Sequence, residues 1–106
     1  MPNQPNVVAL DLTPVMAKQL LGAIASDSSR VFFTDHAEAR MLKRHITRAQ
    51  VLRCLSYGKF VEGPYRDIKG NWRMNLEVFS AGERVSVVTA IGRDASGEMI
   101  IVITVY

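Results

Sequence analysis

A histidine and two arginines are spaced four residues apart in the middle of this chain, at His36, Arg40 and Arg44. On an α-helix, residues i, i+4 and i+8 fall within about 80° of arc, so these side chains share one face. Each guanidinium group can form paired hydrogen bonds with a phosphate. A neutral imidazole beside them is a candidate general base, so the spacing indicates phosphodiester chemistry. An ordinary solvated helix face is the alternative explanation.

His36 falls in the first turn of the predicted helix. The free backbone N–H groups and the helix dipole favour a bound anion there and disfavour a protonated imidazole. Lys43 lies beside the same stripe and extends it. The second histidine, His45, falls at the helix end, where a cation suits the dipole, and it is more typical of a cap than of a catalyst.

The positive charge of the protein is concentrated in one segment. Residues 30–53 carry six Lys or Arg and two Asp or Glu side chains, whereas the net charge of all 106 residues is +3. A basic patch of this kind favours a polyanionic partner such as RNA. We therefore predict that Lys43 and Arg48 bind nucleic acid, and that Arg73, on the polar side of a later strand, joins them.

Other polar residues are weaker candidates. Thr104 and Tyr106 share a parity in the last predicted strand, and Tyr65 and Asn75 lie on polar positions of earlier strands. Cys54 lies in an apolar helix with no base nearby, so we expect it to be buried rather than nucleophilic. One cysteine excludes a disulfide framework and argues against a structural zinc site, and glycine-rich phosphate loops and common hydrolase motifs are absent. The sequence thus predicts neither a metal nor a cofactor.

Three helices are predicted to position these residues, and all lie in the first half of the chain. Capping residues at their starts and serine or glycine signals at their ends give the ranges 13–26, 34–45 and 47–58. We predict Asp35 as the N-cap of the second helix, and Thr47 with Gln50 as a capping pair in the third. Ala37, Met41 and Leu42 are expected on the buried side of the second helix.

The second half of the chain changes to a period of two residues. Strands are predicted at 59–65, 71–80, 84–92 and 98–106, and short turns between them favour an antiparallel meander. Residues 30–33 form either a short strand or a hydrophobic staple, and residues 7–10 are a further short apolar segment that suits an edge strand. The predicted fold is α+β, with N-terminal helices packed on one face of a four-stranded, mainly antiparallel sheet.

The run from Phe33 to Thr47, FTDHAEARMLKRHIT, resembles the H-A-x-x-R-M-x-x-R-x-I-T opening of the domain of unknown function 4258 family. The ending Ile103–Tyr106 resembles that family's last strand. The resemblance covers about residues 32–106. It implies a domain at 31–106 that is similar to the RelE/ParE-like toxins and the barnase–EndoU–colicin–RelE fold. Residues 1–30 would form an added N-terminal arm and helix.

The resemblance implies a metal-independent ribonuclease of a toxin–antitoxin system. His36 would be the general base or acid, Arg40 and Arg44 would bind the phosphate, and Thr104 and Tyr106 would position it. RNA and an antitoxin protein would be the partners. A non-catalytic RNA- or protein-binding module is the alternative, and a structural or regulatory protein with a merely solvated basic face is a third. Because the chain has neither a secretory signal pattern nor a long apolar run, we expect a bacterial-type cytoplasmic protein outside the membrane.

Overall fold

All α-helices of the described part of the chain precede four of its five strands. The computed structural model describes residues 12–106, so the segment at 7–10 lies outside the described residues. The helices are α2 (Pro14–Ala25), α3 (Asp35–Arg44) and α4 (Arg48–Tyr57), and a short 3-10 turn, η1, spans Ser28–Arg30. The strands are β1 (Val31–Phe33), β2 (Lys59–Arg66), β3 (Trp72–Ser80), β4 (Glu83–Asp94) and β5 (Gly97–Val105). The predicted α+β class is confirmed.

The five strands form one mixed sheet in the order β1-β5-β4-β3-β2. The antiparallel meander from β2 to β5 is confirmed. The prediction of four strands was wrong, because residues 31–33 add a fifth that runs parallel to β5, with Val31 opposite Ile100 and Phe33 opposite Val102. Three residues are too few to show a period of two, and their partner lies at the other end of the chain.

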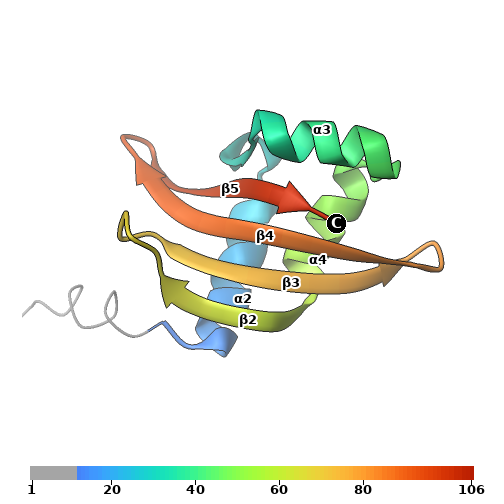
Figure 1. Cartoon of the computed structure of the whole chain (residues 1–106). Helices are drawn as coiled ribbons and strands as arrows, with labels where there is room; N and C mark the ends of the chain where they lie inside the picture. Colours follow the sequence, from blue (N-terminus) through green and yellow to red (C-terminus); the bar gives the residue numbers. More distant parts are fainter. Residues whose placement is uncertain (1–11) are drawn as a thin grey trace, which may run out of the picture.

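Two of the helices cover one face of the sheet and the third lies along its edge. Helices α2 and α4 pack on each other and on the same sheet face, whereas α3 runs beside β5 beyond the end of β1 (Figure 1). The buried cluster between the helices and the sheet draws on every strand except β2 and on all three helices; it includes Leu21, Met41, Leu55, Met74 and Val102. Neither α2 nor α4 covers the opposite face of β3, β4 and β5, which we call the open face.

The N-cap of helix α3 lies one residue before the predicted cap. Thr34, not Asp35, is the N-cap, and its Oγ1 accepts a hydrogen bond from the Ala37 amide at 3.0 Å. The same hydroxyl donates to the Ile103 carbonyl at 2.9 Å, which ties the start of the helix to β5. An ionised Asp side chain can only accept hydrogen bonds, so it could not make both contacts.

The helix α3 buries a narrower face than the pattern predicted. Ala37 and Met41 are buried, but Leu42 is 81% exposed. The prediction that Leu42 faces the core was wrong because α3 lies along one strand at the sheet edge. Only residues four apart on a single stripe can then meet the core.

An extra residue in β5 sets the direction of the side chains at the end of the chain. Val88 pairs with Thr104 and Thr89 pairs with Val102, so Ile103 is a bulge without a partner. The bulge reverses the alternation, which lets Val102 and Val105 both enter the core. Thr104 and Tyr106 consequently share the opposite face, and their predicted common parity is confirmed.

The packing of α4 gives a test of the fold. Leu55 is fully buried, so Leu55→Ala should lower the free energy of unfolding by about 2–5 kcal/mol. The matched substitution Leu42→Ala, on the exposed side of α3, should change it by less than about 0.5 kcal/mol. Urea denaturation followed by circular dichroism measures both. Equal effects of the two substitutions would contradict the arrangement of the helices.

Candidate nucleic-acid interface

The C-terminal half of β5 is held by a helix in place of a strand. Strand β1 pairs with β5 only from Ile100 to Val102. Beyond it, Thr34 donates to the Ile103 carbonyl at 2.9 Å and the Arg40 Nε–H donates to the Val105 carbonyl at 3.4 Å. These contacts satisfy edge carbonyls that a short β1 leaves unpaired. They also fix α3 alongside β5, with both running in the same direction.

This alignment brings His36 and Thr104 to the same level of the sheet. His36 lies between Thr34 and Arg40 on α3, and Thr104 lies between the two carbonyls that these residues bind. Thr104 is on the open face, opposite Val88. The His36 side chain is exposed and has no hydrogen-bond partner within residues 12–106. Its imidazole is therefore accessible but is not oriented by a second side chain.

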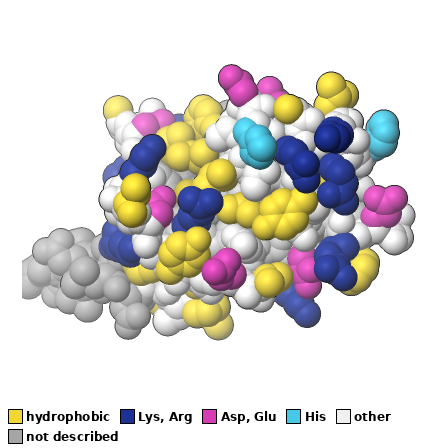
Figure 2. All heavy atoms as spheres, in the orientation of Figure 1, with side chains coloured by type: hydrophobic (Ala, Val, Ile, Leu, Met, Phe, Trp, Pro, Cys, Tyr) yellow, Lys and Arg dark blue, Asp and Glu magenta, His cyan; other side chains and the backbone are white. Residues whose placement is uncertain are grey.

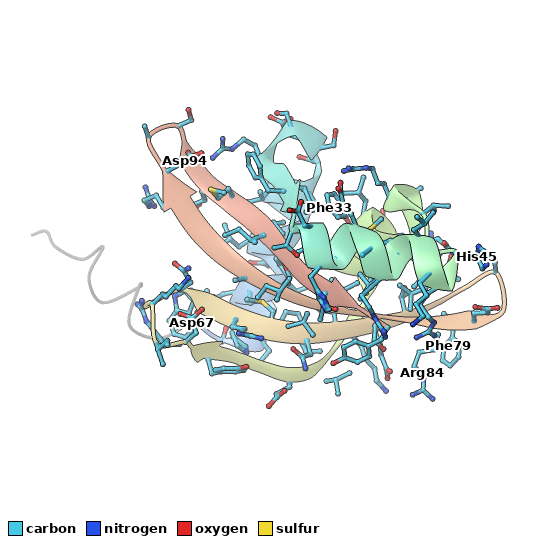
Figure 3. The ribbon with its side chains drawn as sticks, turned by 45° about the horizontal axis from the view of Figure 1, so that its top comes forward. Phe33, His45, Asp67, Phe79, Arg84 and Asp94 are labelled. Atoms are coloured by element: carbon cyan, nitrogen blue, oxygen red, sulfur yellow. The ribbon has the colours of Figure 1, made fainter. Side chains whose placement is uncertain are left out.

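Two arginines from different elements line one hollow at the end of β5. Arg44 of α3 and Arg84 of β4 line an open pocket of about 420 Å³ together with Tyr106, Glu83 and Ser86. Backbone hydrogen bonds of 2.7 and 2.9 Å join Ser86 to Tyr106 and hold that side of the pocket. Arg84 lies beneath the C-terminal end of α3 (Figure 3). We call this hollow the arginine pocket.

The charge of the arginine pocket is positive but not unopposed. The Arg84 Nε lies 3.7 Å from the Glu77 carboxylate, and Glu83 lines the pocket itself. Lys43 and Arg40 add charge from α3, and Figure 2 shows Lys and Arg side chains gathered over this face between the two histidine side chains. An acceptor with several oxygens, such as a phosphate, suits two guanidinium groups that approach from different elements.

Sequence reasoning missed Arg84. The pairing of β4 with β5 places Ser86 opposite Tyr106, and Arg84 shares the parity of Ser86. A correct register for the last two predicted strands would therefore have placed this arginine on the face of Tyr106. The predicted residues Arg44 and Tyr106 line one pocket with it, and Arg40 contacts the neighbouring carbonyl.

Arg48 lies away from this group. Its Nη2 forms a 2.6 Å ion pair with the Glu38 carboxylate, and its guanidinium lies 4.3 Å from the centre of the Phe33 ring. Glu38 is about 160° from Arg40 around α3, so Arg48 is on the other side of the helix. It connects α4 to α3 and β1.

Arg73 shares the open face but not the pocket. It pairs with Ala90, which pairs with Ile101, so one strand, β4, separates it from the β5 position at its level. His45 lies at the far end of α3, as its C-cap in a left-handed conformation with φ of 58° (Figure 3).

A larger hollow of about 500 Å³ lies at the opposite end of the sheet. Leu12, Leu20 and Trp72 contribute to its lining, and Arg66 stacks on the Trp72 ring at 4.5 Å. None of the predicted site residues lines it. Arg66 and Arg93 line it together with Glu98, so this hollow also carries two guanidinium groups. The candidate interface is placed at the arginine pocket because the predicted residues Arg44 and Tyr106 lie there.

Residues 12–106 lack two features that define other kinds of site. No group of three or more His, Cys, Asp or Glu side chains in this range is placed to hold a metal ion. Within the same residues, no helix has both the length and the apolar character needed to cross a membrane.

With this geometry established, the comparisons give the family. Residues 33–106 match the model of the family described as Domain of unknown function (DUF4258), and the chain belongs to that family. Neither a curated protein nor a solved structure matches the chain. Helix α2 lies outside the matched residues, yet Ala17 and Leu21 are fully buried in the same core as the strands. The predicted boundary between residues 1–30 and 31–106 stays a prediction.

Cys54 is buried, as expected, and its chemistry can be tested directly. Burial raises the pKa of the Cys54 thiol to about 12, and the nearby Glu77 charge adds to the shift. We expect a disulfide reagent at pH 8 to label the native protein at least ~10²-fold more slowly than the urea-unfolded chain. Rapid labelling of the native protein would contradict the packing of α4.

The raised pKa of Cys54 also makes the free energy of unfolding depend on pH. The ordinary thiol pKa is 9.0, so the neutral thiol contributes to the free energy of unfolding below pH 9. That contribution should be lost as the pH rises from 9 toward 12. The variant Cys54→Ala, measured beside the wild type over this range, separates it from other alkaline effects.

Proposed function

We propose that this protein is a RelE-like, metal-independent ribonuclease of the toxin type, which acts in the cytoplasm on RNA and is held by an antitoxin protein. The observation that carries the proposal is the arginine pocket, which Arg44 and Arg84 line together with Tyr106. An RNA phosphate is the anion that such a pocket on a basic surface suits. Arg40 and the exposed His36 extend the same surface along β5.

The proposed reaction is transfer of a phosphoryl group within RNA. His36 accepts the proton of a ribose 2′-hydroxyl, whose oxygen forms a bond to the adjacent phosphorus. The bond from phosphorus to the 5′-oxygen breaks, and that oxygen takes a proton from water at this open site. Arg40 and Arg44 stabilise the charge that develops on the phosphoryl oxygens, while Thr104 and Tyr106 position the phosphate. The products are a cyclic phosphate and a 5′-hydroxyl.

A non-catalytic RNA- or protein-binding module is the second candidate. The observation that favours it is the His36 side chain, which lacks a hydrogen-bond partner within residues 12–106. A general base is commonly oriented by another group before it acts. Catalytic hydrogen bonds are also often long or incomplete without substrate, so the two candidates are separated by experiment.

The first experiment measures RNA binding against salt. If Arg44 binds one phosphate, Arg44→Ala should reduce the slope of log K against log salt concentration by about 0.7 to 0.9, because one fewer phosphate is neutralised. Arg84→Ala should do the same. Arg48→Ala is the matched control, because it removes the same charge on the other side of α3, and its slope should equal that of the wild type. An equal reduction of the slope in all three variants would contradict phosphate binding at the pocket, because it would show that only the total surface charge matters.

The second experiment tests catalysis with purified protein, total RNA and EDTA. His36→Asn should lower the cleavage rate by about 10²–10⁴-fold and leave RNA affinity nearly unchanged, because a general base acts in the transition state. His45→Asn is the control, since it changes the other histidine and asparagine tolerates the left-handed conformation found there.

Two outcomes of this experiment would change the assignment. Cleavage by His36→Asn at the wild-type rate, well above a buffer blank, would move the chemistry to other residues. RNA binding without cleavage by the wild type would favour the non-catalytic module.

A further inference from the structure

The open face of β3 carries two polar side chains on an apolar floor. Met74 and Leu76 of this strand are fully buried on the helix side, so Arg73 and Asn75 point to the other face. They lie opposite Ala90 and Val88 of β4. These two floor residues are only 2% and 6% exposed, respectively, although α2 and α4 lie on the other side of the sheet. The polar pair therefore lies low on this face and not on its outer rim.

One atom of each polar side chain is buried without a hydrogen bond. Within residues 12–106, the Arg73 Nε and the Asn75 Oδ1 have no partner. Polar atoms that are hidden from solvent are nearly always paired, so two such atoms on consecutive positions of one face need an explanation. Both are on the same sheet face as Thr104 and Tyr106.

The orientation of the Asn75 amide is fixed by its neighbour. Its Nδ2 donates to the Glu62 carboxylate at 3.0 Å. A carboxylate accepts hydrogen bonds and does not donate them, so the amide nitrogen must face Glu62 and the oxygen must face away. The unpaired pair is thus one donor, from Arg73, and one acceptor, from Asn75.

This combination selects against a bare phosphate. Phosphate oxygens accept from Arg73 but have no hydrogen to give to the Asn75 oxygen. The edge of a nucleobase carries an acceptor beside an N–H donor, which matches both atoms. Tyr65 lies directly opposite Arg73 on β2 and is 40% exposed, so its ring is available for stacking.

Arg73 and Asn75 lie within the length of one or two nucleotides of the arginine pocket. Asn75 pairs with Val88, and Ser86 of the pocket is two residues away on the same strand. Two residues span about 7 Å along a strand, and neighbouring strands are about 4.8 Å apart. A strand of RNA with a phosphate at the pocket can therefore place a base over β3.

We propose that Arg73 and Asn75 form a nucleobase subsite, which reads the edge of one base of the RNA bound at the arginine pocket. The inference rests on the proposed function for its choice of ligand. Because the two atoms are hidden from solvent in the free protein, the Arg73 side chain shifts as the base enters. Arg73 then donates to a ring nitrogen or carbonyl of the base, Asn75 accepts from an amino or imino group, and Tyr65 packs on the ring. A protein partner would offer backbone amides to the same atoms, and the test separates it from RNA.

The first arm of the test uses nucleosides, which have no phosphate. Isotope-labelled protein is titrated with adenosine, cytidine, guanosine and uridine, and the side-chain amide signal of Asn75 is followed by NMR. We expect this signal to shift with at least one nucleoside and unequally among the four, while the Asn71 amide signal and a titration with ribose 5-phosphate serve as controls. Absence of a shift with every nucleoside would overturn the subsite and favour a protein ligand.

The second arm measures the affinity for four homopolymer oligoribonucleotides. The wild type should prefer one base by about fivefold or more, and Arg73→Lys, which keeps the charge but removes Nε, should lose the preference and retain most of the affinity. Equal affinities of the wild type for all four would overturn base reading while leaving the arginine pocket intact. If no RNA binds but nucleosides shift the Asn75 signal, the proposed function fails and the subsite stands.

Discussion

The short parallel pairing of β1 with β5 is the constraint on which the rest of the structure depends. Because β1 ends at Phe33, half of β5 would present unpaired carbonyl groups at the sheet edge. The chain turns there into α3, and Thr34 and Arg40 bind the carbonyls that the strand leaves free. The helix that carries the basic stripe is therefore placed by side-chain hydrogen bonds to the backbone carbonyls of β5. Its exposed face meets the open side of the sheet as a consequence.

Local signals predicted the helices well and long-range pairing poorly. The capping box of Thr47 and Gln50 was predicted because it involves residues three apart. Gly58 ends α4 as predicted, but it is extended, and a Cβ there would lie 2.4 Å from the Cys54 carbonyl oxygen. The signal was therefore correct for a different physical reason. The segment that forms the fifth strand was predicted as either a strand or a staple. Its place in the sheet could not be predicted, since three residues carry no period and the partner is about 70 positions away.

The residues of the candidate interface also differ in whether local spacing or long-range pairing places them. The stripe of His36, Arg40 and Arg44 follows from helical spacing alone, and the structure keeps it on one face of α3. The separate location of Arg48 depends on an ion pair between two helices, and no pattern within α4 indicates that partner. The part played by Arg84 requires the register of β4 against β5, which alternation leaves undetermined. Sequence thus supplied the helix side of the interface and only part of the sheet side.

The hydrogen bond from Arg40 to the end of β5 has an entropic consequence. An exposed arginine samples many rotamers, and a ligand that immobilises it must overcome that freedom. Here the Nε–H is already held by the Val105 carbonyl, which fixes the plane of the guanidinium while its two terminal nitrogens stay available. Part of the rotamer freedom of Arg40 is therefore lost when the protein folds. An anion that binds beside Arg40 therefore meets a guanidinium whose orientation is set by its hydrogen bond to the edge of the sheet.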